Sequence, residues 1–452
     1  MNNIYFGLFF LFIGVFTYAQ NSQNTEASRL STIKFGTETE IASLIQTLRD
    51  ENADDLDDEL ITLIETTRNQ RILSGVFAFF GEREKSGLER RAIRALEERE
   101  DETNETVLSA IDYLGRVMAA EAIPALMEIL DTEERRFMNN AIRALGRAAS
   151  ASERYAEEAA DFLVDYFENR NPGNENTRDI IIAVGATGSV RVVPFLVEIA
   201  SNPDERIPLR IAALEALSRV GDPSGLEAVL GCIGANDPNV RSAAVAALGP
   251  FSGEEVDKAI LDAFRDSFYR TRIAAAQASR ERRLVEAVPY LQFRAERDDV
   301  PNVRDEAIRA LGEIANDEAI SVLDSLFTER KNSDRVRLLA AEMLMRTAGE
   351  KNLGRLIVEL DEAKTRNQTV LYNGFLKVVG EAVINGDTVE MENLTRHFLR
   401  SGGIMEKLYG LDMAANNELK NLSEEIKALT EDRNESLARR ARRTLERLGI
   451  DI

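Results

Sequence analysis

The amino-acid sequence predicts an all-α fold in which pairs of helices stack into a solenoid. The first observation is composition: the 452 residues include 10 Pro and no Trp, and they are rich in Ala, Leu, Glu and Arg, which are strong helix formers. The second is a short sequence that returns every 31 to 39 residues along most of the chain. A period of this length is typical of two-helix units that bury their apolar faces only by stacking on their neighbours.

The second helix of each predicted unit carries the repeated sequence. The pentapeptide Ala-Ile-Arg-Ala-Leu occurs at 92–96, 141–145 and 307–311, and the segment 240–249 aligns with 303–312. Related segments end at 115, 146, 185, 218, 249, 280, 312, 345 and 380. We name this helix "helix B" and the helix before it "helix A".

Helix A has its own pattern, in Ala122-Ile-Pro124-Ala-Leu126 and again in Val192-Val-Pro194-Phe-Leu196. Apolar residues recur there at i, i+3, i+4 and i+7, and Pro is tolerated in a first helical turn. Between the two helices, the segments 236–240 and 299–303 each supply Asp, Asn and Pro. Asp or Asn caps the coming helix, and Pro ends the preceding one.

Asp/Asn-x-x-Val-Arg-x-x-Ala-x-x-Ala-Leu-Gly, preceded by Ala-Ile/Val-Pro-x-Leu, resembles the bacterial HEAT repeat, and most closely the HEAT-like class found in phycobilisome lyases. The resemblance is clear over 105–350 and weaker over 38–449. It implies an all-α, right-handed α-solenoid of about twelve HEAT-like helix pairs. We expect capping and irregular repeats over 38–115, regular repeats over 116–349, and divergent repeats with a cap over 350–452.

Residues 1–19 have the layout of a secretory signal peptide. The segment Ile4–Tyr18 is apolar and uncharged, and Thr17 and Ala19 are small residues at the expected positions before a cut that follows Ala19. No Lys or Arg precedes the apolar segment, so an uncleaved N-terminal anchor is the alternative. We expect a periplasmic or secreted protein with a linker over 20–37, and contact with a membrane only if this segment stays uncleaved.

The residues that catalysis or metal binding would need are scarce. The only histidine is His397, and the only cysteine, Cys232, lies in an apolar stretch where we expect it to be buried. The acidic run 51–60 lacks the Gly and the distal Glu of an EF-hand loop, so we interpret it as the solvated start of a helix. No nucleotide-binding or hydrolase motif occurs. We therefore expect no enzyme activity, cofactor, metal or small-molecule substrate.

Charge bears on the partner. The net charge of −22 argues against nucleic acid and against anionic lipid. One arginine recurs at the second position of helix B. It could form a row of basic side chains that binds an acidic ligand, but we favour ion pairs with acids of the turns in the same or the adjacent repeat. Such acids are Asp204, Asp237, Asp299 and Asp334. The recurring arginines are Arg210, Arg241, Arg272, Arg304 and Arg337. A further basic group, 439–443, we place late in the final helix, where cations oppose the helix dipole.

Because helix B lines the concave face of a HEAT solenoid, we expect its free positions to bind a protein or peptide partner. In this register the candidate residues are Asn139, Arg143, Glu215, Gln277, Asp305, Arg309 and Glu342. The sequence thus predicts an exported scaffold or adaptor. The alternatives are a structural assembly factor of an envelope complex, or a lyase-like enzyme or ligand carrier with a site in 350–430.

Overall fold

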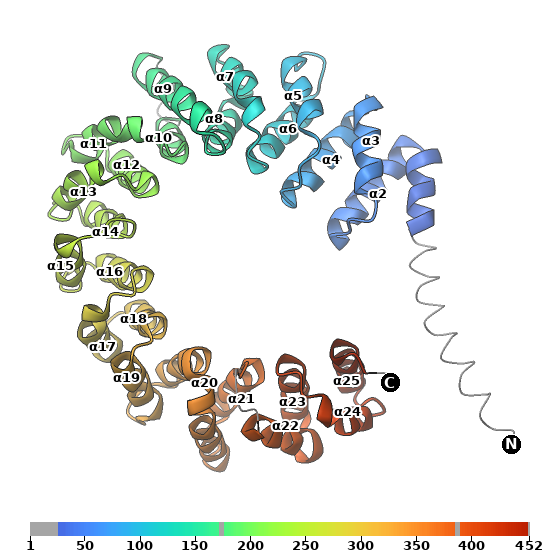
Figure 1. Cartoon of the computed structure of the whole chain (residues 1–452), viewed down its shortest axis with the longest axis vertical. Coiled ribbons are helices and arrows are strands. Elements are labelled where there is room, and N and C mark those ends of the chain that lie inside the picture. The colour runs from blue at the N-terminus through green and yellow to red at the C-terminus, as the bar shows by residue number, and fades with distance from the viewer. Residues whose placement is uncertain (1–25, 171–175, 385–388, 451–452) are drawn as a thin grey trace, which may run out of the picture. The chain divides into compact units, whose positions relative to one another are not determined.

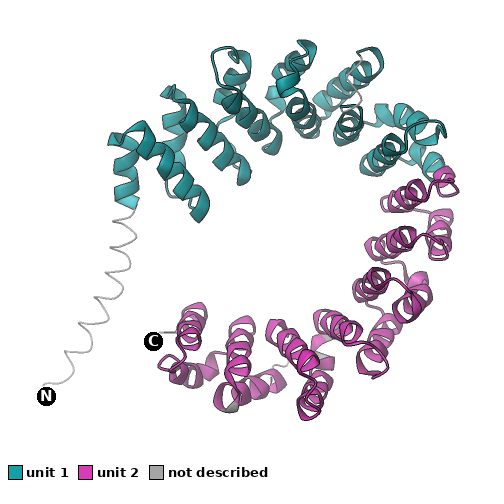
Figure 2. Cartoon of the chain, turned by 180° about the vertical axis from the view of Figure 1, so that it is seen from behind, with its two compact units in different colours: residues 1–229 teal, residues 230–452 magenta. Residues whose placement is uncertain are grey.

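Helices follow one another in antiparallel pairs along the whole described chain (Figure 1). The computed structural model describes residues 26–170, 176–384 and 389–450, and those ranges contain no strand. The all-α solenoid prediction is therefore confirmed. The chain divides into two units, residues 1–229 and 230–452 (Figure 2), and the division falls within α13 (Leu226–Cys232).

In unit 1 a helix over 26–35 and α2 (Glu38–Glu51) precede the repeats. Helix A positions are taken by α3 (Asp57–Thr66), α5 (Glu89–Glu97), α7 (Ile123–Asp131), α9 (Glu153–Asn169) and α11 (Val193–Ser201). Helix B positions are taken by α4 (Gln70–Glu82), α6 (Asn104–Arg116), α8 (Arg135–Ala149), α10 (Thr177–Ala186) and α12 (Ile207–Val220). The B helices pack side by side in chain order, on the inner side of the curve of this unit (Figure 1).

Unit 2 continues the same order. Helix A positions are taken by α15 (Glu254–Ala263), α17 (Val288–Arg297), α19 (Asp317–Thr328), α22 (Val389–Ser401) and α24 (Ser423–Leu429). Helix B positions are taken by α14 (Pro238–Ala246), α16 (Tyr269–Glu281), α18 (Pro301–Ile314), α21 (Thr369–Glu381), α23 (Ile404–Asn416) and α25 (Glu435–Leu448). The long helix α20 (Asp334–Thr365) serves two repeats, because it packs on α18 and α19 and also pairs with α21.

The predicted cap is present in the turn 236–240 but not in 299–303, where no side chain caps α18. The Asp237 side chain accepts hydrogen bonds from the backbone N–H groups of Asn239 and Val240, at 2.8 and 3.2 Å, and so caps α14.

Pro238 and Pro301 lie in the first turns of α14 and α18, so they begin helix B and do not end helix A. Pro124 and Pro194 lie in the first turns of α7 and α11, each of which follows a short 3-10 turn. These local signals mark where α7, α11 and α14 begin.

The glycine that follows the repeated Ala-Leu marks the closest approach between neighbouring B helices. A Cβ atom at Gly146 of α8 would lie 2.7 Å from the carbonyl oxygen of Ala183 in α10. At Gly185 of α10, a Cβ atom would lie 2.5 Å from the Cβ of Ala216 in α12. Side chains larger than hydrogen are excluded at these positions, so the backbones can pack directly on each other.

Two boundaries differ from the prediction. The linker expected over 20–37 contains the helix over 26–35, which Arg29 joins to Asp55 in the turn between α2 and α3, with Nη1 and Oδ1 3.1 Å apart. The boundary expected at 349/350 falls inside α20, since no proline or capping sequence interrupts that helix. In the acidic run, Asp57 is not solvated: its side chain is 5% exposed and bonds to Arg83.

The signal peptide predicted over 1–19 lies outside the described residues. Among the helices that are described, none combines the length and the apolar character needed to cross a bilayer. His397 is exposed on α22, and Cys232 is buried at the end of α13.

Candidate partner-binding faces

The recurring arginine of helix B points into the fold rather than onto a binding face. Arg241 pairs with Asp266, with Nε and Oδ2 2.8 Å apart, and Arg337 pairs with Glu359 at 2.6 Å. Asp266 lies in the turn of the following repeat, as does Asp298, which binds Arg272 at 2.7 Å, whereas Glu359 lies within α20. The ion-pair interpretation therefore holds for Arg241, Arg272 and Arg337, although Asp237 acts as a helix cap instead. Arg210 donates to the carbonyl of Ala200, and Arg304 forms no ion pair within the described residues.

Six of the seven predicted partner-binding residues reach the surface. Asn139 and Arg143 on α8 and Glu215 on α12 are exposed in unit 1. In unit 2, Arg309 on α18 and Glu342 on α20 are exposed, and Gln277 on α16 is half-buried. Helix α16 packs on α18, and α18 packs on α20, so Gln277, Arg309 and Glu342 lie on three neighbouring B helices. Asn139 and Arg143 instead share one helix, α8.

Asp305 is the exception, and its prediction as a surface residue is wrong. Its side chain is 5% exposed, and both carboxylate oxygens accept from Arg335 Nε at 3.0 and 3.1 Å. The neighbouring helix α20 covers this position, so Asp305 joins two B helices and is not available to a partner.

Helix α8 carries a basic exposed face in unit 1. Arg135, Asn139, Arg143 and Arg147 follow one another at intervals of four residues, and all four are exposed. Residues four apart lie on one side of an α-helix. Within the described chain, Arg143 and Arg147 form no ion pair or hydrogen bond through their side chains. We call these four residues the α8 face.

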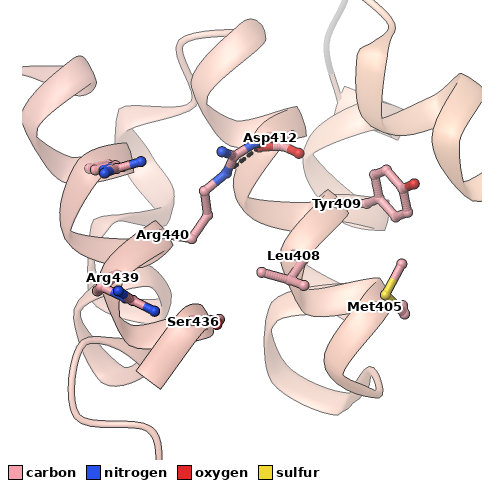
Figure 3. Close-up of a pocket in the computed structure, with 8 residues that line it drawn as sticks. Met405, Leu408, Tyr409, Asp412, Ser436, Arg439 and Arg440 are labelled. Carbon is pink, nitrogen blue, oxygen red and sulfur yellow. Dashed lines mark hydrogen bonds and ion pairs between the residues drawn. The ribbon is translucent and has the colours of Figure 1, made fainter. Parts of the chain in front are cut away.

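A groove lies between the neighbouring helices α23 and α25 in unit 2 (Figure 3). Its volume is about 460 Å³. The residues that line it are Met405, Leu408, Tyr409, Asp412, Ser436, Arg439, Arg440 and Arg443. We call it the α23–α25 groove. Figure 3 shows Arg440 reaching from α25 to Asp412 on α23, where Nε and Oδ1 are 2.8 Å apart, whereas Arg439 has no such partner.

Glu406, near the start of α23, joins that helix to the preceding helices. Its carboxylate accepts from Lys364 Nζ at 2.6 Å, from the Tyr372 hydroxyl and from the backbone N–H of Gly403. Burial alone would raise the pKa of Glu406, but these three donors stabilise the ionised carboxylate and lower its pKa to about 2. The carboxylate is therefore ionised at neutral pH and joins α20, α21 and α23.

The sequence points to this part of the chain only through the alternative of a site in 350–430, which includes the α23 wall of the groove. The segment 381–430 lacks the repeat consensus, so nothing singled out Met405, Leu408 or Tyr409. The sequence predicts that the arginines of 439–443 lie late in the final helix and oppose its dipole. They lie in the middle of α25, which runs to Leu448, and only Arg447 occupies its last turn. That interpretation is wrong for Arg439 and Arg443, whose position on the groove wall needs another reason.

Comparison with known proteins places the chain among helical repeat proteins. Residues 33–444 match the model of a family described as "Spirochaete HEAT repeat protein". No curated protein sequence matches.

Solved structures with a similar fold include the karyopherin Kap121p bound to the extreme C-terminus of the protein phosphatase Cdc14p. That match has a TM-score of 0.44 at 14% identity and covers 93% of this chain and 53% of the karyopherin. Kap121p bound to Nup53p matches at a TM-score of 0.44 and 13% identity, over 92% and 52% of the two chains. YibA of E. coli matches at a TM-score of 0.37 and 16% identity, over 57% of this chain and 96% of YibA. The chain thus spans about half the length of the karyopherins. Because the family model covers most of the sequence, the chain belongs to the spirochaete HEAT repeat protein family.

Proposed function

We propose that this protein is an exported adaptor that binds a protein or peptide partner along the helix-B faces of its solenoid. The α8 face is the observation that carries the proposal. Acidic residues outnumber basic ones by 22 in the chain, yet Arg143 and Arg147 stay without an acidic partner in the described structure. Exposed guanidinium groups in a row can form bidentate hydrogen bonds to carboxylates of a partner.

A binding role is favoured over catalysis by the kind of surface that is present. The B helices present extended rows of polar side chains on a stacked scaffold, which suits recognition through many contacts. The likeness to the repeats of phycobilisome lyases stays a prediction from the repeat pattern. It contributes no activity to the proposal, because function depends on a site and not on the fold.

Site-specific photo-crosslinking in native cells tests the proposal. A photo-reactive residue in place of Asn139 is expected to capture a defined protein, identified by mass spectrometry. The same substitution at Arg154, which is exposed on helix A α9 of the same unit, is the control. Capture at 139 should fall in the variant R143E/R147E, while R154E should leave it unchanged. Recovery of the same proteins from both positions would show that the α8 face has no specific partner.

We also propose export, with cleavage after Ala19. The support is the uncharged apolar segment, followed by small residues just before Gln20. The intact mass of the protein purified from its native cells is expected to correspond to a chain that starts at Gln20. A chain that keeps residues 1–19 and sediments with membranes would favour the uncleaved anchor.

A further inference from the structure

The α23–α25 groove contains two arginines whose charges are not neutralised. On α25, Arg440 binds Asp412, Arg442 donates to the carbonyl of Thr430 at 2.9 Å, and Arg447 donates to Asn416 at 3.3 Å. Arg439 and Arg443 are exposed and form no ion pair or hydrogen bond within the described residues. They are four residues apart, so they lie on one side of the helix, where like charges repel and slightly destabilise it.

The opposite wall of the groove is apolar and aromatic. Met405 is 49% exposed, and Leu408 and Tyr409 are half-buried. The ring of Tyr409 is positioned by a close approach to α21, because a Cβ atom at Gly380 would lie 2.4 Å from its Cδ1. Aromatic, methionine and arginine side chains are enriched where proteins bind each other, and a ring that is held in place loses little entropy on binding.

We propose that the α23–α25 groove binds an acidic peptide segment of a partner protein. Carboxylates of the segment pair with Arg439 and Arg443, and one of its apolar side chains packs on Met405, Leu408 and Tyr409. This inference shares one assumption with the proposed function, namely that the faces of the B helices bind protein partners. It adds a second site, in unit 2, and specifies the chemistry of the ligand.

Charge complementarity selects this occupant. The two free guanidinium groups suit a segment with acids one helical turn or a few extended residues apart. A nucleic acid would need more cations in a row than the two free arginines of this groove provide. A second copy of this chain is also strongly acidic overall, so general attraction between copies is not expected.

Binding is measured by fluorescence anisotropy with the full mature chain. The probe is the labelled peptide Asp-Glu-Leu-Asp-Glu-Phe-Asp-Glu. One control peptide replaces Leu and Phe with Ser, and the other replaces each acid with Lys. We expect the first peptide to bind, the Ser peptide to bind more weakly, and the Lys peptide not to bind.

Three charge variants make the test specific. R439E is expected to lower the affinity about tenfold or more, because it removes one charge-assisted pair and adds a repulsion. R433E makes the same change in net charge in the turn before α25, outside the groove, and should leave the affinity within about twofold. D412N should raise the affinity several-fold, because it removes a repelling carboxylate and releases Arg440 to the ligand.

Y409A tests the apolar wall and should weaken the acidic peptide severalfold while leaving the Ser peptide nearly unchanged. Circular dichroism of each variant checks that the fold is intact. Equal losses for R433E and R439E, or equal binding of the acidic and Lys peptides, would overturn the proposal. So would displacement of the peptide by a single-stranded oligonucleotide as effective as unlabelled peptide. A failure here with intact crosslinking at the α8 face overturns this inference alone.

Discussion

Arg272 and Asp298 form a buried two-pronged ion pair, in which Nε–Oδ2 and Nη2–Oδ1 are each 2.7 Å apart. The remaining nitrogen of Arg272, Nη1, donates to the carbonyls of Asp266 and Ser267 in its own turn. One side chain thus joins the turns of two successive repeats. Burial alone would raise the pKa of Asp298, but Arg272, the backbone N–H of Val300 and Arg294 together lower it. The recurring arginine is therefore part of the stacking interface.

Substituting Asp298 with Asn should destabilise unit 2 by about 3–5 kcal/mol, because it removes the only buried counter-charge that the described residues offer the Arg272 guanidinium. Asp299 provides a matched control: it also contacts Arg272, at 3.0 Å, but its side chain is 87% exposed. D299N should cost less than about 1 kcal/mol. Urea unfolding followed by circular dichroism measures both, and equal midpoints for the two variants would refute the interface role.

Substituting Gly185 with Ala should destabilise the stacking of α10 on α12 by about 1–3 kcal/mol, because the new methyl group would overlap the backbone and Cβ of Ala216. In an uncrowded helix the same change stabilises by roughly 0.5–1 kcal/mol. Gly231 in α13 has no atom within 4 Å of its Cβ position, so G231A is the control and should be neutral or stabilising. Thermal unfolding of both variants measures the change in stability, which should be a loss for G185A and no change or a gain for G231A.

Asp305 and Arg309 lie one helical turn apart on α18 but should respond differently to substitution. D305N should lower the free energy of unfolding by about 1–3 kcal/mol, because it weakens the buried hydrogen bonds to Arg335. R309A removes a side chain that is 44% exposed and contacts Glu306 at 3.5 Å, so it should cost less than about 1 kcal/mol. The urea midpoints of unfolding of the two variants test this difference. A larger loss of stability for R309A than for D305N would contradict the prediction.

Much of the fold could be predicted because its signals are local. Helix ends follow from Asp237 and Pro124, and the repeat period follows from the Ala-Leu-Gly segments that pack on each other. Burial of Asp305 could not be predicted, since it depends on where the neighbouring helix α20 lies across α18. Spacing along one helix cannot distinguish a position covered by the next helix from a position open to solvent.

The candidate binding residues were likewise predictable where they depend on the repeat pattern and unpredictable where they depend on neighbouring helices. The α8 face was partly predicted, as Asn139 and Arg143, because α8 keeps the repeat consensus. The residues of the α23–α25 groove could not be predicted individually, because α23 lacks the repeat consensus. One wall of the groove includes Tyr409, whose position depends on contact with Gly380 in another helix. The arginines of α25 were visible in the sequence, but which of them are paired depends on Asp412, Asn416 and Thr430.

Substituting Glu406 with Gln should destabilise unit 2 by about 1–2 kcal/mol at neutral pH, since it weakens the charge-assisted hydrogen bonds from Lys364 and Tyr372. The effect should depend on pH in a defined direction. The pKa of Glu406 is about 2 in the folded chain and about 4.5 as the ordinary value. A lowered folded-state pKa stabilises the fold above the unfolded-state value, and that stabilisation is lost as the pH falls toward 2.

The difference in free energy of unfolding between the wild type and E406Q should therefore be constant above about pH 5.5 and shrink between about pH 4.5 and 2. Urea titrations at a series of pH values measure it, and comparing two proteins at each pH cancels the titration of all other carboxylates. Glu390, exposed at the start of α22, serves as the control site, where E390Q should give no pH-dependent difference of comparable size. A difference that stays constant down to pH 2 would mean that Glu406 stabilises α23 through packing alone, and its ionisation would then have no part in holding the wall of the groove.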